Sequence, residues 1–285
     1  MDSPQPIGLF DSGVGGITVL QAVQRLLPQE ALLFVADQAH VPYGARPLQE
    51  VQSFSEGVVR YLLDQKSKLI VVACNTASAA ALSYLREKFR GVPFVGMEPA
   101  VKPAVEQTQS GVVGVLATQA TFQGTLYASV VARFGKGVKV LQDTCAGLVS
   151  QIEAGALHSA ETRAILENAL HPMLAQGIDA VVLGCTHYPF VTPIIQEIAG
   201  PGVRIIDPAP AVARQTQRLL NQYHLHNPDG TLHPPIRFLT TSSPEHLRQV
   251  IEVLPLDSAL RNSLTISSLS WQETANMARE LHGKA

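Results

Sequence analysis

The 285-residue sequence has little of several features that mark large protein classes. It contains only three cysteines, widely spaced and odd in number, which does not fit a disulfide framework and indicates a reducing compartment. Charged residues make up 15% of the chain, the formal net charge is −2, and no cluster of lysine or arginine is present. A nucleic-acid partner is therefore not indicated, because such partners are bound largely through positive charge.

Long apolar runs are also missing from the sequence. No run approaches the roughly 20 residues that a membrane-spanning helix needs, so we expect no membrane association. The opening residues, Met-Asp-Ser-Pro-Gln-Pro, have no basic region leading into an apolar core, and we expect no signal peptide. These features predict a soluble cytoplasmic protein, and its length allows one large domain or two smaller ones.

Short apolar segments, by contrast, are abundant. Such segments alternating with helical patterns are typical of parallel strands that are buried on both faces. Strands are predicted at residues 7–10, 32–36, 69–73, 93–97, 112–117, 138–142, 180–184, 203–206, 236–240 and 264–269. Helices are predicted at about 48–63, 77–89, 122–134, 145–153, 160–175, 211–223 and 244–253. This alternation predicts an α/β protein with two similar doubly wound domains and mainly parallel sheets.

The order of the segments suggests how the two domains share the chain. The strand and helix alternation begins again near residue 112, and no low-complexity linker separates the two sets. We expect one domain made of residues 1–99 and 209–285, with residues 100–208 inserted as the second. Two similar domains facing each other would form one cleft between them.

Two cysteines stand where the chemistry of such a fold is expected. Cys74 directly follows the strand at 69–73, and Cys185 follows the strand at 180–184. Ligands of parallel sheets bind beyond the carboxyl ends of the strands, so a thiol is expected on each wall of the cleft. Hydrogen-bonding pairs follow both cysteines, Asn-Thr after the first and Thr-His after the second.

Other interpretations of these cysteines stay open at this stage. A free cysteine is often only a small buried hydrophobic residue, as we expect for Cys145 on its predicted helix. Cys74, Cys185 and His187 could instead bind zinc, although the close-spaced cysteine pairs of most zinc sites do not occur. His187 could also supply charge or a proton to the neighbouring thiol.

The remaining polar motifs each allow two interpretations. The Asp11-Ser12-Gly13-x-Gly15-Gly16 motif is either a carboxylate or phosphate site at a helix N-terminus or a tight turn with a capping aspartate. Pro42-Tyr43-Gly44 is typical of a turn with an aromatic anchor. Thr118 and Thr121 could donate hydrogen bonds to a carboxylate or cap a helix. Glu153 falls late in a predicted helix, where a solvated side chain is expected.

Four motifs together resemble a known family. They are Asp11-Ser12-Gly-x-Gly-Gly, Val41-Pro-Tyr43-Gly44, Ala73-Cys74-Asn75-Thr76-Ala77 and Gly184-Cys185-Thr186-His187-Tyr188-Pro189, in this order. The combination is similar to glutamate racemases of the cofactor-independent aspartate/glutamate racemase superfamily, from about Ile7 to beyond Thr240. The chain departs from the family pattern at Asp37-Gln38-Ala39-His40, where Asp-Thr-Ala-Arg is expected, and at Pro47.

The resemblance implies a bacterial enzyme that interconverts L- and D-glutamate without pyridoxal phosphate or metal and supplies D-glutamate for peptidoglycan. It implies that Cys74 takes the proton from D-glutamate and Cys185 from L-glutamate, with a homodimer in the cytoplasm. The implied substrate contacts are Asp11, Ser12, Tyr43, Gly44, Asn75, Thr76, Thr186 and His187, followed in rank by Thr118, Thr121 and Glu153. An aspartate racemase, a metal-dependent hydrolase and a non-catalytic amino-acid-binding protein remain alternatives.

Overall fold

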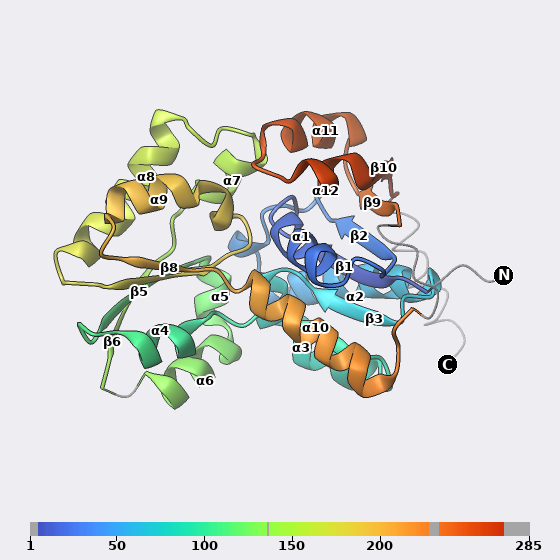
Figure 1. Cartoon of the computed structure of the whole chain (residues 1–285), viewed down its shortest axis with the longest axis horizontal. Helices are drawn as coiled ribbons and strands as arrows, with labels where there is room; N and C mark the ends of the chain where they lie inside the picture. The colour runs from blue at the N-terminus through green and yellow to red at the C-terminus, as the bar shows by residue number, and fades with distance from the viewer. Residues whose placement is uncertain (1–4, 136, 228–233, 271–285) are drawn as a thin grey trace.

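A computed structural model describes residues 5–135, 137–227 and 234–270, which fold around two parallel sheets (Figure 1). The larger sheet has the strand order β10-β9-β2-β1-β3-β4, and the smaller has the order β6-β5-β7-β8. The larger sheet consists of β1 (Ile7–Asp11), β2 (Leu32–Ala36), β3 (Leu69–Val72), β4 (Phe94–Gly96), β9 (Ile236–Thr240) and β10 (Leu264–Ser268). The smaller consists of β5 (Val112–Ala117), β6 (Lys139–Asp143), β7 (Ala180–Gly184) and β8 (Arg204–Ile206).

The central strands β1, β2, β3 and β7 are buried along their whole length, and their successive residues point to opposite faces of the sheets. In β1, Leu9 belongs to one buried cluster and Phe10 to another. In β7, Leu183 and Val182 likewise belong to different clusters. Each face must therefore be covered by helices, which explains why the strands are continuous apolar runs. The predicted α/β class with doubly wound parallel sheets is confirmed.

Helices cover these faces, as Figure 1 shows most clearly for the smaller sheet, where α4 and α6 lie on one side and α8 and α9 on the other. The α-helices are α1 (Ile17–Leu26), α2 (Leu48–Asp64), α3 (Asn75–Lys88), α4 (Val101–Gln107), α5 (Gln119–Gln123), α6 (Thr125–Phe134), α7 (Leu148–Glu153), α8 (Ala160–Leu174), α9 (Thr192–Ala199), α10 (Ala209–Tyr223), α11 (Pro244–Val253) and α12 (Ser258–Ser263). Two short 3₁₀ helices, η1 (Tyr43–Ala45) and η2 (Tyr188–Val191), follow strands β2 and β7.

Several helix predictions need correction. The predicted helix at 122–134 is two helices, α5 and α6, because Gly124 between them has extended backbone angles, φ −70° and ψ 139°. The predicted helix at 145–153 begins only at Leu148, because Cys145 has φ 44° and Gly147 φ 90°, both outside the helical region. Helices α4, α9 and α12 are six to eight residues long and were not predicted.

The chain returns to the larger sheet after passing through the smaller one. Strand β9 pairs with β2, strand β10 pairs with β9, and helix α10 packs on α1. The division into domains at residues 99/100 and 208/209 stays a prediction. No helix within the described ranges is both long and apolar enough to cross a bilayer.

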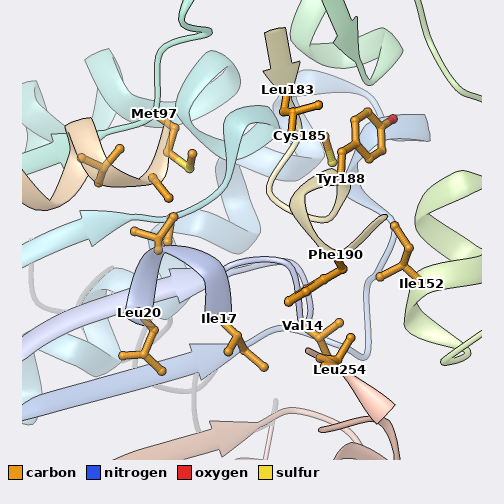
Figure 2. Close-up of a cluster of buried hydrophobic side chains, with 14 of the residues drawn as sticks. Val14, Ile17, Leu20, Met97, Ile152, Leu183, Cys185, Tyr188, Phe190 and Leu254 are labelled. Carbon is orange, nitrogen blue, oxygen red and sulfur yellow. The ribbon is translucent and has the colours of Figure 1, made fainter. Parts of the chain in front are cut away.

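One buried cluster runs from the larger sheet into the smaller (Figure 2). Val14, in the loop after β1, belongs to the same cluster as Ile152 of α7 and Phe190 of η2. Cys185 and Tyr188 also belong to it, close to the carboxyl end of β7. This shared core holds the loop after β1 against the segment around α7, which brings the ends of β1 and β7 together.

A polar network on the outer side of the larger sheet ties α2 to α3. Glu56 of α2 accepts hydrogen bonds from Arg60 and from Tyr84 and is paired with Lys88 at 2.7 Å. Burial alone would raise the pKa of Glu56, but hydrogen bonds from Lys88, Tyr84 and Arg60 lower it from 4.5 to about 2. The ionised carboxylate is therefore favoured in the folded state.

This shift predicts a dependence of stability on acid. Because the folded pKa lies below the unfolded one, the stabilisation is complete above pH 4.5 and is lost as the pH falls towards 2. Between pH 4.5 and 2, the unfolding free energy of Glu56→Gln should therefore fall by about 1 to 2 kcal/mol less than that of the wild-type protein, allowing for solvent screening. Urea unfolding at several pH values measures it. Glu245→Gln, which removes an exposed carboxylate paired with Arg248, is the control and should leave the slope unchanged.

Candidate active site

The ends of the two sheets enclose a small cavity that both predicted catalytic cysteines line. Its volume is about 10 Å³, and it is lined by Ser12, Pro42, Tyr43, Gly44, Cys74, Asn75, Thr76, Thr118, Val149, Cys185, Thr186 and His187. The structure thus brings most of the predicted site residues together, and only Asp11, Thr121 and Glu153 lie behind the lining. A cavity of this size holds about one water molecule, so its walls must separate to admit an amino acid.

A larger cavity adjoins this one. Its volume is about 170 Å³, and it shares four lining residues with the small cavity: Pro42, Gly44, Thr118 and Val149. It contains one cysteine, Cys145, which is buried and packed in the core as predicted. The two cavities are therefore separated only by these shared residues.

Cys74 caps the N-terminus of α3 and lies next to a buried carboxyl group. Its Sγ accepts a hydrogen bond from the N–H of Ala77 at 3.4 Å. Burial raises the pKa of Cys74 well above its ordinary value, and the charge of Asp11 and its hydrogen bond to the thiol add to this effect. Burial also raises the pKa of Asp11, against the opposing influence of His187. Cys74 is therefore held as a thiol.

Cys185 lies beside a charged histidine. The Nδ1 atom of His187 is 3.7 Å from Cys185 Sγ, and its Nε2 is 2.6 Å from Glu153 Oε1. Burial would lower the pKa of His187, but the hydrogen bonds to Cys185 and Glu153 hold it well above its ordinary value. The Nδ1 atom of the imidazolium therefore faces the sulfur of Cys185. The two thiols thus have unlike environments, one next to a carboxyl group and the other next to a cation.

Glu153 corrects a prediction, because its side chain is buried and not solvated. The residue is 9% exposed at the end of α7, where its carboxylate accepts hydrogen bonds from His187 and from the N–H of Val14 at 2.7 Å. Burial would raise its pKa, but the hydrogen bond and charge of His187, with Val14 and Gln38 as further donors, lower it. The helix-end position in the sequence gave no sign of this role, which depends on a loop 139 positions away.

The glycine-rich loop after β1 is closed by the protein's own carboxylates. The N–H groups of Ser12 and Gly16 donate to Asp11 at 2.7 and 2.5 Å, and that of Val14 donates to Glu153. These contacts agree with the tight-turn interpretation, in which Asp11 caps the turn. Gly13 is needed for space, since a Cβ there would lie 1.8 Å from Glu153 Oε1.

Three threonine hydroxyls form a cluster between the ends of β3 and β5. Thr76 Oγ1 is 2.8 Å from Thr118 Oγ1, which is 2.9 Å from Thr121 Oγ1. Thr118 also caps α5 by accepting from the N–H of Thr121, so the capping interpretation is confirmed. Gly44 packs directly on this cluster, because a Cβ there would lie 2.6 Å from Thr118 Cβ.

Asn75 has the features expected of a side chain that binds a ligand. It is 3% exposed, it lines the small cavity, and neither its Nδ2 nor its Oδ1 has a hydrogen-bond partner. A buried amide without partners costs about 1–3 kcal/mol, so the fold bears this cost at a position facing the two thiols. A polar ligand in the cavity would offset it.

This cost predicts that removing the amide raises the stability of the protein and weakens the binding of substrate. Asn75→Leu removes the unpaired amide and keeps the branched shape of the side chain, so the protein should gain about 1 kcal/mol of unfolding free energy while its KM for substrate rises at least about tenfold. Urea unfolding and steady-state kinetics measure the two effects. A variant that lost stability and kept its KM would contradict this account of Asn75.

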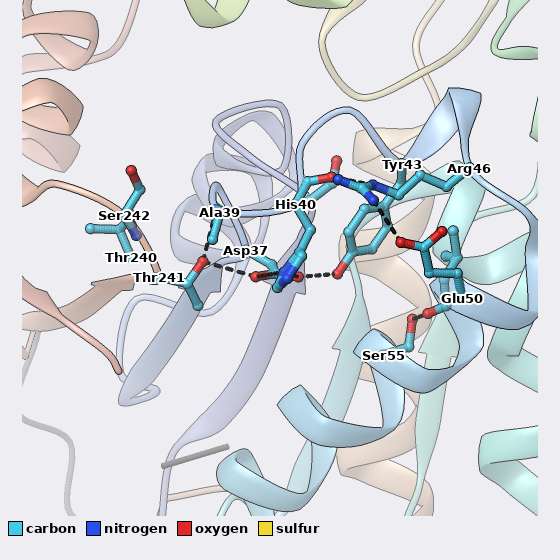
Figure 3. A network of polar contacts seen from close by, with 12 residues as sticks. Asp37, Ala39, His40, Tyr43, Arg46, Glu50, Ser55, Thr240, Thr241 and Ser242 are labelled. Atoms are coloured by element: carbon cyan, nitrogen blue, oxygen red, sulfur yellow. Dashed lines mark hydrogen bonds and ion pairs between the residues drawn. The ribbon is translucent and has the colours of Figure 1, made fainter. Parts of the chain in front are cut away.

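Two residues of the site were missed by sequence reasoning, and both follow β2. Asp37 is fully buried and accepts hydrogen bonds from the Tyr43 hydroxyl at 2.6 Å and the Thr241 hydroxyl at 2.8 Å, with His40 Nδ1 at 2.9 Å (Figure 3). This network fixes the loop that carries Tyr43 and Gly44. The strand-end position of Asp37 was the signal that could have found it. The second is Gln38, which hydrogen-bonds Glu153.

Among the described residues, no group of three or more His, Cys, Asp or Glu side chains could hold a metal ion. In particular, Cys74, Cys185 and His187 do not form such a group. His187 instead makes its contacts with one thiol and one carboxylate.

Comparison with known proteins identifies the family. Residues 16–216 match the model of the Asp/Glu/Hydantoin racemase family. The chain belongs to this family. It is 48% identical over 268 residues to a glutamate racemase from Roseiflexus sp. (strain RS-1), covering 93% of this chain and 98% of that protein. The resemblance drawn from the four motifs is therefore confirmed.

Solved structures of this racemase family show the same fold. The glutamate racemase of Escherichia coli, in complex with L-glutamate and the activator UDP-MurNAc-ala, is 32% identical with a TM-score of 0.80, over 94% of this chain and 99% of that one. The glutamate racemase of Francisella tularensis, in complex with D-glutamate, is 30% identical with a TM-score of 0.79, over 93% and 97%. The similarity thus covers both sheets.

Proposed function

We propose that this chain is a glutamate racemase that interconverts L- and D-glutamate with Cys74 and Cys185 as its two bases. The observation that carries this proposal is the placement of both thiols on one cavity, in unlike electrostatic environments. A racemase must remove a proton from one face of Cα and return one to the other, so it needs two groups of this kind. The choice of glutamate rests on the names and bound ligands of the relatives.

The unlike environments suggest how one turnover runs from L- to D-glutamate. Cys185, as thiolate beside the His187 imidazolium, takes the Cα proton and becomes a thiol. Cys74, held as a thiol by burial and Asp11, then gives its proton to the opposite face of Cα and becomes a thiolate. The N–H of Ala77 and the N-terminus of α3 stabilise the charge left on Cys74. The reverse direction exchanges the two roles.

The other predicted site residues would hold the substrate during these steps. We assign Asn75, Thr76, Thr118 and Thr186 to the α-carboxylate, where donors would stabilise the carbanionic transition state. Thr121 would hold Thr118 in place from behind. Tyr43 and Gly44 would lie near the side-chain carboxylate. Ser12 would complete the wall next to Cys74, and Asp11, Glu153 and His187 would act through the thiols.

Several further aspects belong to the same proposal. The reaction as written needs no cofactor and no metal, since both proton transfers use thiols. Because the relatives are bacterial glutamate racemases, we propose that the D-glutamate formed serves peptidoglycan synthesis in a bacterial cytoplasm. A homodimer is the proposed assembly, as the family resemblance implies.

Exchange at Cα tests the activity directly. Incubation with L-glutamate in deuterated water should replace the Cα proton and abolish the optical rotation, and D-glutamate should give the same final mixture. L-aspartate should react far more slowly. Folded protein that shows neither exchange nor loss of rotation with glutamate would overturn the proposed function.

A further inference from the structure

Glu153 is the point where elements of the two sheets meet through hydrogen bonds. Its Oε1 accepts from Val14 N–H and faces His187 Nε2, while its Oε2 accepts from Gln38 Nε2 at 3.1 Å. Val14 and Gln38 follow strands β1 and β2 of the larger sheet, whereas Glu153 and His187 lie around the smaller one. These contacts therefore join the loops after two strands of the larger sheet to residues around the smaller one.

Gln38 is itself held in one orientation. An ionised carboxylate accepts hydrogen bonds and cannot donate them, so the amide must turn its nitrogen towards Glu153. The amide oxygen then faces Thr240, the last residue of β9. The Oγ1 of Thr240 donates to Gln38 Oε1 at 2.8 Å. Thr240 is fully buried and in turn accepts from the N–H of Ser242. The link from Thr240 to Glu153 is thus built from satisfied polar groups.

We propose that Gln38 is a positioning residue for Cys185, acting through Glu153 and His187. Its amide fixes the second oxygen of the Glu153 carboxylate and with it the plane of that group. The carboxylate fixes the imidazole, whose other nitrogen faces the thiol at 3.7 Å. This inference rests on the proposed function, since it concerns the proton transfer assigned to Cys185.

The effect of Gln38 should be larger at one of the two thiols than at the other. The neighbours of Cys74 are Asp11 and the N–H of Ala77, and Asp11 is held by Ser12, Gly16 and Thr186. The side chain of Gln38 instead hydrogen-bonds Glu153 and Thr240. Loss of the Gln38 amide should therefore slow proton transfer at Cys185 more than at Cys74.

Isotope effects can separate the two transfers. The substitution is Gln38→Leu, which keeps a side chain of similar bulk and removes its amide. We expect kcat/KM to fall about tenfold. This is the smaller end of the losses seen when a residue that orients a functional side chain is removed. The fall must be equal in both directions, because the equilibrium constant between enantiomers is one. With substrates deuterated at Cα, the isotope effect on kcat/KM should rise for L-glutamate, whose C–D bond Cys185 breaks, and fall for D-glutamate.

Two further variants complete the experiment. Thr240→Val removes the hydroxyl that orients Gln38 and should shift both isotope effects in the same directions by a smaller amount. Gln142→Leu is the matched control. This glutamine lies on edge strand β6 and donates a hydrogen bond to the Tyr127 hydroxyl of α6. It should leave both isotope effects and kcat/KM unchanged.

The results distinguish this inference from the proposed function. If Gln38→Leu lowers kcat/KM but leaves the ratio of the two isotope effects at the wild-type value, its role is structural and the inference is overturned. A shift in the opposite sense would assign Gln38 to Cys74 and overturn it as well. Wild-type protein without exchange at Cα would overturn the proposed function itself.

Discussion

Replacing Cys74 or Cys185 by serine is expected to lower kcat/KM for glutamate racemisation by about 10²- to 10⁴-fold, the range typical of a lost acid or base. A serine hydroxyl fills nearly the same space as a thiol but is far less acidic, so it cannot serve as the base and is a poor replacement as the acid. Because each thiol acts in both directions, each single substitution should affect both. Polarimetry with purified variants measures the loss.

The residual activities should also differ between the two variants. Cys185→Ser keeps Cys74, so any remaining exchange of the Cα proton with deuterated water should occur with D-glutamate. Cys74→Ser should show the converse with L-glutamate. Cys145→Ser is the matched control, since this third buried thiol lines only the neighbouring cavity. Wild-type rates in both single variants would eliminate the two-base mechanism.

Gly13→Ala is expected to lower kcat/KM by about 10²-fold, because a displacement of about 1 Å at a site can cost that much. The new Cβ would lie 1.8 Å from Glu153 Oε1 and 2.7 Å from its Cδ. The carboxylate is held by Val14, Gln38 and His187, so it cannot move aside without losing these contacts. The loss would reach Cys185 through His187.

A double-mutant cycle separates this clash from a general effect on the loop. In a Glu153→Ala background the obstructing atoms are gone, so Gly13→Ala should lower kcat/KM by little more. Gly202→Ala is the control, because no atom lies within 4 Å of a Cβ at that position and its activity should be unchanged. Equal losses from Gly13→Ala in both backgrounds would show that Glu153 is not the cause.

Much of the fold could be predicted because the signal is local. The central strands are runs of apolar residues, and β5 and β7 have the predicted bounds 112–117 and 180–184. Short helices were missed where there are too few turns for the apolar spacing to repeat, as in α4 and α12. The break at Gly124 was missed because apolar spacing continues across it.

In the candidate site, too, only residues with a local signal in the sequence could be predicted. The two cysteines could be found because they follow strands that the sequence itself reveals, and Asn75 and His187 are their neighbours in the chain. Glu153 was ranked low and expected to be solvated, and Gln38 was noted only as a departure from the family pattern. Neither has a local signal, since their partners lie 139 and 115 positions away.

The sequence by itself determined the class of fold, the strand ends that carry the thiols and, through four motifs, the family. Only the tertiary structure decided which polar groups meet across the two sheets: Glu153 with Val14 and Gln38, Thr186 with Asp11, and Thr76 with Thr118. The physical reason is that periodicity and capping act over a few residues, whereas these contacts depend on how two sheets pack. The unlike surroundings of Cys74 and Cys185 follow from that packing.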